Sequence, residues 1–221
     1  MLRRQLRQEG VKVRRRHVAT LMKKMGIEAL APQPGTSQRA PGNKIYPYLL
    51  RDVAITRSNQ VWALDTTYIP MARGFVYLTA VVDVASRRVL AHKVAITLEA
   101  CHAREVIDAA FARYGTPEIV NTDQGSQFTA ETFTEAVLAQ GCKLSMDGRG
   151  AWRDNVFVER VWRSVKYERV YLKAYDSVSA ARADIADYIH WYNTGRPHSS
   201  LDDVTPEAAY LDWLPKLAEA A

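Results

Sequence analysis

The hydrophobic residues that follow position 58 fall into three runs rich in Val, Tyr, Thr and Leu. The runs are Val61–Ile69, Phe75–Val84 and Arg88–Ile96, and turn signals at Arg73-Gly74 and Ser86-Arg87 separate them. Residues of these types favour β-strands, and connections this short join neighbouring strands that run in opposite directions. The pattern therefore predicts an antiparallel three-stranded meander.

Beyond the meander, helical and strand patterns alternate. The predicted elements are a helix at about 99–113, a strand at 118–122, a helix at about 130–140, a short strand at 142–146 and a long helix from about 154. This βββαβαβα order predicts an α/β domain built on a mixed five-stranded sheet. Two more helices are predicted near 178–193 and 206–218, with a turn at Gly195 and Pro197 between them.

The first part of the chain has a different pattern, with a short helix predicted at 2–9 and a second helix at about 14–25. The apolar residues of the second helix recur at the spacing of one helix face and are Val18, Leu21, Met22 and Met25. Its basic residues are Arg14, Arg15, Arg16, Lys23 and Lys24. A basic amphipathic helix after a short turn is typical of the second half of a DNA-binding helix-turn-helix. A packing hairpin with a charged face fits the pattern equally well.

Proline and glycine are concentrated at 31–47, which predicts a linker. The chain is accordingly divided into a partial helix-turn-helix element at 1–30, a linker at 31–57, an α/β core at 58–175 and a helical C-terminal extension at 176–221.

Charge is distributed unevenly along the 221 residues. The net charge is +6, but residues 1–60 hold 13 Lys/Arg against 3 Asp/Glu, whereas the rest holds 17 against 21. A basic arm on a mildly acidic domain predicts a polyanionic partner, most plausibly nucleic acid, and a merely solvated basic face is the alternative. No run approaches the roughly 20 apolar residues of a membrane-spanning helix. The two cysteines form no disulfide or zinc motif, so a reduced cytoplasmic protein is expected.

Three acidic residues carry the candidate chemistry. Asp65 interrupts an apolar, strand-like run, Asp123 follows another such run and precedes Gly125, and Glu159 falls on the long predicted helix. A carboxylate within a strand is costly to bury unless a partner compensates its charge. Each residue has a simpler explanation as well: Asp123 could form a turn, and Glu159 could be an ordinary exposed helix residue. Asp65 is the hardest to explain in this way, because strand centres disfavour Asp.

Oxygen ligands of this kind suit hard divalent cations. Without a cation, three neighbouring carboxylates would repel one another, and Mg²⁺ or Mn²⁺ would relieve that repulsion. Two such ions about 4 Å apart could activate a water or a 3′-hydroxyl and stabilise the leaving oxygen of a phosphodiester. Lys166 lies seven residues after Glu159 and shares its helix face, with Trp162 and Arg163 at adjoining positions.

At these residues the chain resembles the retroviral-integrase superfamily, and specifically the orfB-type insertion-sequence transposases, over about residues 11–210. The interval of 35 residues between Asp123 and Glu159 is that family's signature, and Lys166 stands where the family has a basic residue. The segments that carry the resemblance are Asn59–Ile69, Asp123–Phe128, Asp154–Glu159, Tyr192–Leu201 and Thr205-Pro206.

The resemblance implies an RNase H-like fold in which Asp65, Asp123 and Glu159 are the catalytic residues and hold two Mg²⁺ or Mn²⁺ ions. It implies a DDE transposase that nicks double-stranded DNA at the transposon ends and joins the freed 3′-hydroxyl to target DNA. Lys166, with Arg163 beside it, would contact transposon-end DNA. A homo-oligomer on DNA, a partner from an upstream reading frame and a place at the bacterial nucleoid are implied as well.

Some features depart from the family pattern and leave alternatives open. Thr66, Asn121-Thr122 and Ala151 replace the more usual neighbours of the acidic residues. Relatives usually have a further stretch before the position of residue 1, which allows a transposition-incompetent remnant that only binds DNA or full-length transposase. An RNase H-type nuclease acting on RNA–DNA hybrids fits the fold, but it does not explain the basic arm or the C-terminal motif.

Overall fold

The computed structural model describes residues 6, 10, 11, 13–25, 44–147 and 156–215. The chain forms two compact units, Met1–Thr36 and Ser37–Ala221. In the first unit, α2 (Arg15–Lys24) confirms the second predicted helix. Most of the first predicted helix, and the part of the predicted linker at 31–43, lie outside the described residues.

The apolar face predicted for α2 is only partly covered. Val18 is buried, whereas Leu21 is 41% and Met25 61% exposed. The helix predicted from this spacing is thus present, with two of its four apolar side chains exposed.

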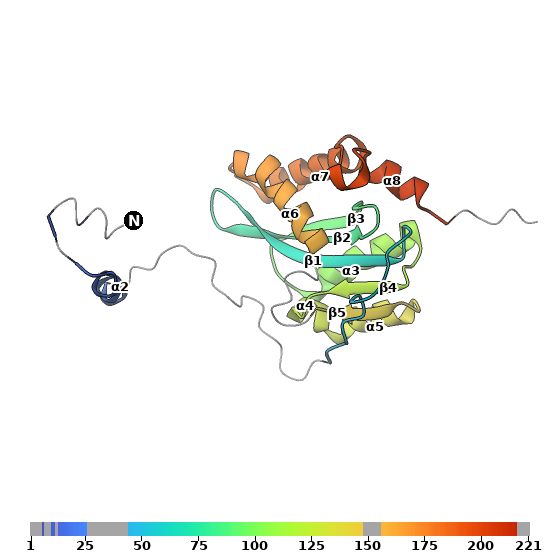
Figure 1. The fold of residues 1–221 in the computed structure, drawn as a ribbon, viewed down its shortest axis with the longest axis horizontal. Helices are drawn as coiled ribbons and strands as arrows, with labels where there is room; N and C mark the ends of the chain where they lie inside the picture. The colour runs from blue at the N-terminus through green and yellow to red at the C-terminus, as the bar shows by residue number, and fades with distance from the viewer. Residues whose placement is uncertain (1–5, 7–9, 12, 26–43, 148–155, 216–221) are drawn as a thin grey trace, which may run out of the picture. The chain divides into compact units, whose positions relative to one another are not determined.

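The second unit is built on a mixed five-stranded sheet in the order β3-β2-β1-β4-β5 (Figure 1). The pairings β1–β2 and β2–β3 are antiparallel, and β1–β4 and β4–β5 are parallel. The predicted meander and the mixed sheet are thus confirmed. The strands are β1 (Val61–Pro70), β2 (Phe75–Asp83), β3 (Val89–Ala95), β4 (Ile119–Thr122) and β5 (Lys143–Met146).

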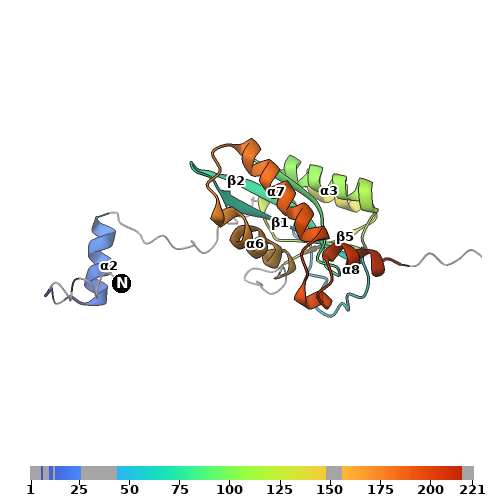
Figure 2. The same cartoon turned by 90° about the horizontal axis from the view of Figure 1, so that it is seen from above.

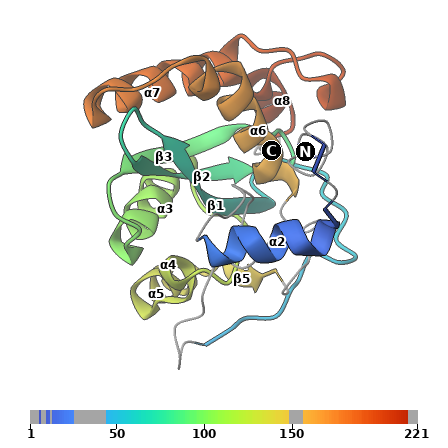
Figure 3. The same ribbon diagram turned by 90° about the vertical axis from the view of Figure 1, so that its left-hand side faces the viewer.

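Helices lie on both sides of this sheet, as Figures 1 and 3 show. One side carries α3 (Ala100–Tyr114), α4 (Ser126–Thr129) and α5 (Glu131–Ala139). The other carries α6 (Val156–Glu168), α7 (Val178–Thr194) and α8 (Pro206–Asp212). Figure 2, seen from above, looks down onto α7. The short α4 was not predicted, and α8 ends at Asp212, earlier than the predicted 218, with a turn and bend following it.

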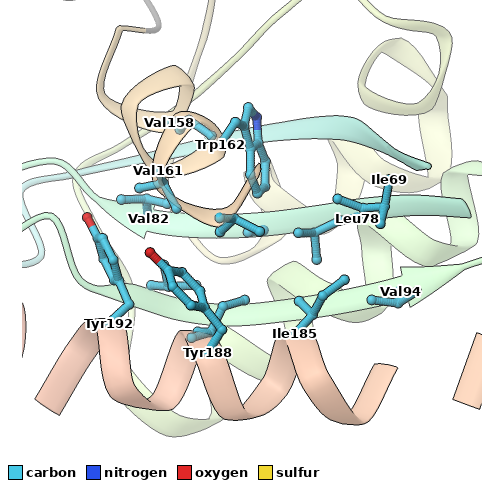
Figure 4. Close-up of a cluster of buried hydrophobic side chains, with 14 of the residues drawn as sticks. Ile69, Leu78, Val82, Val94, Val158, Val161, Trp162, Ile185, Tyr188 and Tyr192 are labelled. Carbon is cyan, nitrogen blue, oxygen red and sulfur yellow. The ribbon is translucent and has the colours of Figure 1, made fainter. Parts of the chain in front are cut away.

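Two hydrophobic cores follow from the alternation of side chains along β1. Ala63 and Ile69 face the core under α6 and α7, whereas Trp62 and Leu64 face the core under α3 and α5. Figure 4 shows the first core, where Ile185 of α7 lies against the sheet. By the same alternation, any odd-numbered polar residue of β1 faces α6, and this decides which side of the sheet carries the site.

Part of the predicted linker lies against the core. Leu49, Leu50 and Ile55 pack on the cluster under α6 and α7, and Tyr46 packs on the opposite one. The Leu49 amide also donates to Ser145 Oγ at 3.0 Å. The residues from 44 to 57 are therefore attached to the second unit. None of the helices in the described ranges has the length and apolar character needed to span a membrane.

Candidate active site

The parallel pairing of β1 with β4 places two aspartates side by side. Ala63 lies opposite Asn121 in this ladder, so continuing the register by two residues brings Asp65 opposite Asp123. Neighbouring strands are about 4.8 Å apart, and residues two apart share one face of the sheet. Two segments that are distant in the sequence thus contribute one acidic pair, with Asp65 in the middle of β1 and Asp123 directly after the end of β4.

The Asp65 carboxyl lies in a setting that disfavours its charged form. Burial, then the charge of Asp123 and more weakly that of Glu159 raise its pKa from 3.8 to about 7. Two hydrogen bonds act in the opposite direction, because Trp162 Nε1 donates to Oδ2 at 2.8 Å and the Thr66 amide donates to Oδ1 at 2.7 Å. Asp65 is thus in electrostatic contact with both other predicted acidic residues, and an added cation would stabilise their ionised forms.

Helix α6 runs along β1, and two side-chain contacts join them at matching distances along the helix and the strand. Trp162 donates to Asp65, and Lys166 Nζ donates to Thr67 Oγ1 at 2.6 Å. Four residues of helix advance about 6 Å and two residues of strand about 6.7 Å, so the two pairs align. Burial lowers the pKa of Lys166, while the charge of Asp65 raises it. Lys166 therefore stands beside the acidic pair, and Arg163, one position after Trp162, is exposed.

Glu159 lies in the first turn of α6, where the helix dipole favours a negative charge. Its side chain is exposed, and partial burial of the carboxyl raises its pKa. It precedes Trp162 by three residues, about one helical turn, so it belongs to the end of α6 that faces the aspartates. Asp154 and Asn155, which precede this helix in the sequence, lie outside the described residues.

The loop after β4 orients Asp123. The Gly125 amide donates to Asp123 Oδ1 at 2.9 Å, so Asp123 does form the turn that its Asp-x-Gly sequence allowed. A Cβ on Gly125 would lie 2.9 Å from that same oxygen and 2.7 Å from the Gln127 side-chain amide. The turn and the placement of the candidate ligand therefore depend on the same glycine.

A buried polar network supports this loop, and the sequence did not predict it. Ser145 Oγ donates to Asn121 Oδ1 at 2.7 Å, and Asn121 Nδ2 donates to Asp147 Oδ1 at 2.9 Å. Gln124 Nε2 adds a bond to the Asp147 carbonyl at 2.7 Å. Asn121, one of the residues that depart from the family pattern, joins β4 to β5 two residues before Asp123. The feature of the sequence that could have indicated this network was the polar Asn121 within the apolar run that forms β4.

Substitution of Asn121 by Leu, which is similar in size, is expected to lower the free energy of unfolding by about 1–3 kcal/mol. The change deprives Ser145 and Asp147 of one buried hydrogen-bond partner each. Chemical denaturation of wild type, Asn121→Leu, Ser145→Ala and the double variant would measure the loss. The double variant should lose less than the sum of the single variants, and strictly additive losses would contradict a shared network.

Comparisons with known proteins agree with this geometry. A family model described as "Integrase core domain" matches residues 55–151, and a second model of the same description matches residues 140–206. A simian T-cell lymphotropic virus intasome superimposes with a TM-score of 0.63 at 17% identity, covering 83% of this chain and 65% of that one. The magnesium complex of the HTLV-2 integrase catalytic core domain superimposes with a TM-score of 0.55 at 20% identity, covering 70% and 97%. These likenesses confirm the RNase H-like fold.

The curated relatives settle the family. Transposase InsF for insertion sequence IS3A of Escherichia coli (strain K12) is 30% identical over 209 residues, which cover 92% of this chain and 73% of InsF. This chain belongs to the insertion-sequence transposases. It is a DDE transposase with an integrase-type core, of the class that acts in DNA transposition and integration, and this membership favours the enzyme over the DNA-binding remnant.

Other residues of the transposase separate into those with a structural role and those that remain candidates. Asp83 accepts from the Asn59 amide and from Ser86, so it stabilises a turn and is unsuited to binding a metal. In the first unit Arg14, Arg16 and Lys24 are exposed. The side chains of Arg15 and Lys23 are outside the described residues, so the predicted DNA contacts of this helix stay predictions.

A compact group of possible metal ligands lies elsewhere in the transposase. Among the described residues, Cys101, His102 and Glu105 of α3 have ligand atoms that all lie within 4.8 Å of one another. They are exposed or partly exposed, and Glu105 is already paired with Lys93. The oxygens of Asp65, Asp123 and Glu159 are not drawn together that closely, as expected for carboxylates that repel one another.

Proposed function

We propose that Asp65, Asp123 and Glu159 are the catalytic residues of this transposase and bind two Mg²⁺ or Mn²⁺ ions. The observation that supports this most directly is that Asp65 of β1 is in electrostatic contact with Asp123, just after the neighbouring parallel strand β4, and with Glu159 of α6. A set of carboxylate oxygens fits hard divalent cations. When bound, such ions would activate the attacking oxygen and stabilise the leaving oxygen of a phosphodiester.

The neighbouring residues hold these carboxylates in position. Trp162 and the Thr66 amide bind one oxygen each of Asp65, and the Gly125 amide holds Asp123. Lys166, beside Asp65, is placed to contact a backbone phosphate of transposon-end DNA, and exposed Arg163 is placed to contact the same duplex. Arginine and lysine supply such contacts because their charges replace the counterions of DNA.

The chemistry consists of two displacements at phosphorus. In the first, a water oxygen attacks at the element end, the bond from phosphorus to the 3′-oxygen breaks, and a 3′-hydroxyl is released. In the second, that hydroxyl attacks a phosphodiester of target DNA, and a 3′-oxygen of the target leaves. Both steps need the same three carboxylates, because only the nucleophile differs.

The partners of the enzyme follow from this chemistry. The substrates are double-stranded terminal repeats and target DNA, and Arg14, Arg15, Arg16, Lys23 and Lys24 of α2 are further candidate contacts. A homo-oligomer holding two ends together, a partner from an upstream reading frame and a place at the bacterial nucleoid are proposed on the family membership. The intasome among the structural neighbours supports assembly on DNA.

Glu159→Gln is expected to abolish metal-dependent nicking and strand transfer, because it removes a ligand charge and keeps the side-chain size. Wild type and variant would be compared with Mg²⁺ and with Mn²⁺ on duplex DNA carrying the terminal repeats that flank the gene. Exposed Glu131→Gln on α5 serves as the matched control. A Glu159→Gln variant that cleaves at the wild-type rate would falsify the metal triad. Preferential cleavage of an RNA–DNA hybrid would instead favour the nuclease alternative.

A further inference from the structure

A second group of charged side chains lies next to α6 and is not part of the acidic site. Arg87 comes from the turn between β2 and β3, Arg160 from α6, and Arg196 and His198 from the segment after α7. The Arg87 guanidinium lies 4.0 Å from the centre of the Phe157 ring, which is also on α6. Segments from three parts of the chain therefore bring several positive charges together beside this helix.

Shared contacts make these residues close neighbours. Phe157, which Arg87 covers, lies about one helical turn before Arg160, and the Tyr192 ring lies 5.8 Å from the Arg196 guanidinium and 6.5 Å from the His198 ring. Burial, followed by the charge of Arg160, lowers the pKa of Arg87 to about 10. Burial and then the charges of Arg196, Arg87 and Arg160 lower the pKa of His198. The buried Tyr192 hydroxyl is in electrostatic contact with both Arg87 and Arg196. Like charges that repel one another here create a local potential that attracts an anion.

The acidic residues nearby neutralise only part of this charge. Glu168 is paired with Arg196 by several hydrogen bonds of 2.6–3.2 Å. Asp83, the acid next to Arg87, already accepts from the Asn59 amide and from Ser86. Asp203 lies on the His198 side, where its amide donates to the His198 carbonyl.

Two of the cations are left with capacity to bind. Arg87 is partly exposed and donates from Nη1 to the Val84 carbonyl, whereas its Nε is buried and has no hydrogen-bond partner among the described residues. Arg160 is exposed and forms no ion pair within the part of the chain that the structure describes. A guanidinium with unused donors is suited to a phosphate, which offers several acceptor oxygens.

The structure assigns Arg87, Arg160 and His198 to a second phosphate-binding site that holds the backbone of bound DNA next to the acidic centre. Arg160 directly follows Glu159 on α6, about 100° around the helix, so a duplex whose scissile phosphate lies at Glu159 presents another phosphate to this group. The inference rests on the proposed function and adds a DNA contact outside the triad and Lys166. The His198 carbonyl closes a turn by accepting from the Leu201 and Asp203 amides, and its ring Nδ1 lies 3.0 Å from Ser200 Oγ.

Arg160→Gln tests the site, since an exposed side chain can change without loss of the fold. Affinity for a fluorescein-labelled DNA duplex would be measured by anisotropy over a range of salt concentrations. All proteins would carry Asp65→Asn, and divalent metal would be left out, so that no cleavage occurs. Arg160→Gln is expected to weaken binding severalfold and to reduce the slope of log affinity against log salt by about one. Lys143→Gln is the matched control, because exposed Lys143 pairs with Ile119 at the opposite end of β4 from Asp123.

A second variant distinguishes one shared phosphate from separate contacts. Arg87→Gln, accepted only if its melting temperature stays near that of the parent, should weaken binding as well. The double variant should lose less affinity than the product of the two single losses. Two results would overturn the shared site and leave the proposed function standing. One is an Arg160→Gln variant whose log affinity falls with log salt as steeply as in the parent protein. The other is a double variant whose loss of affinity equals the product of the two single losses. Absence of DNA binding in the parent protein would overturn both the shared site and the proposed function.

Discussion

Asp65→Asn is expected to eliminate DNA cleavage and strand transfer, with a loss on the order of a thousandfold or more. The change removes a charged ligand from the centre of the site, and metal ions there supply several kcal/mol of transition-state stabilisation. Asn is close to Asp in size and keeps an oxygen that can accept from Trp162 or Thr66. The loss would therefore report on the missing charge. Exposed Asp176→Asn is the control, and nicking at the wild-type rate by Asp65→Asn would remove Asp65 from the mechanism.

Asp65→Asn should also change how the free energy of unfolding of the metal-free protein depends on pH. The pKa of Asp65 is about 7 in the folded protein, against an ordinary value of 3.8. Between these values the folded state binds more protons than the unfolded state, so the free energy of unfolding falls as pH rises. The fall attributable to Asp65 is roughly 2–4 kcal/mol, since one unit of pKa corresponds to about 1.4 kcal/mol.

Denaturation curves at pH 4 to 7, recorded with a chelator present, would check this. Wild type should lose stability across the window, and Asp65→Asn should follow a visibly flatter course, whereas Asp176→Asn should follow wild type. Parallel curves for wild type and Asp65→Asn would contradict the burial of this carboxyl. Added Mg²⁺ should restore stability to wild type at pH 7, because binding to the folded state alone stabilises it.

Gly125→Ala is expected to reduce cleavage by about ten- to a hundredfold, a loss of roughly 1.4–2.7 kcal/mol of transition-state stabilisation, and to leave the fold nearly unchanged. The added Cβ would lie 2.9 Å from Asp123 Oδ1 and 2.7 Å from the Gln127 amide, so both side chains must move. These are the ends of side chains, which shift at small energetic cost. The φ angle of Gly125 is −61°, so the backbone accepts alanine without strain.

The measurement pairs cleavage rates with melting temperatures for wild type, Gly125→Ala and Ser126→Ala. Ser126 is the neighbouring exposed residue at the start of α4 and controls for a general change in the loop. The expected result is a selective loss of activity in Gly125→Ala. Equal losses of stability and activity would mean that the glycine supports the fold, and unchanged activity would mean that the position of Asp123 is not critical.

The local pattern of the chain determined most of its elements and all three acidic candidates. Alternating strand residues and short turns predicted β1, β2 and β3 to within a few residues, because those features depend on neighbours in sequence. An aspartate within the run that forms β1 was identifiable because burying a charge without compensation is unfavourable. The family resemblance added the pairing of Asp123 with Glu159, which spacing alone left open.

Only the tertiary structure decided which distant residues meet. The order β3-β2-β1-β4-β5 places Asp123 beside Asp65, and nothing in either segment specifies that pairing or its register. The network of Asn121, Ser145 and Asp147 and the approach of Arg87 to α6 have the same origin. Such contacts depend on which strands distant in sequence pair with one another and on which later helices cover the sheet. Local propensity therefore determined the elements of this transposase, and packing between segments distant in sequence determined its site.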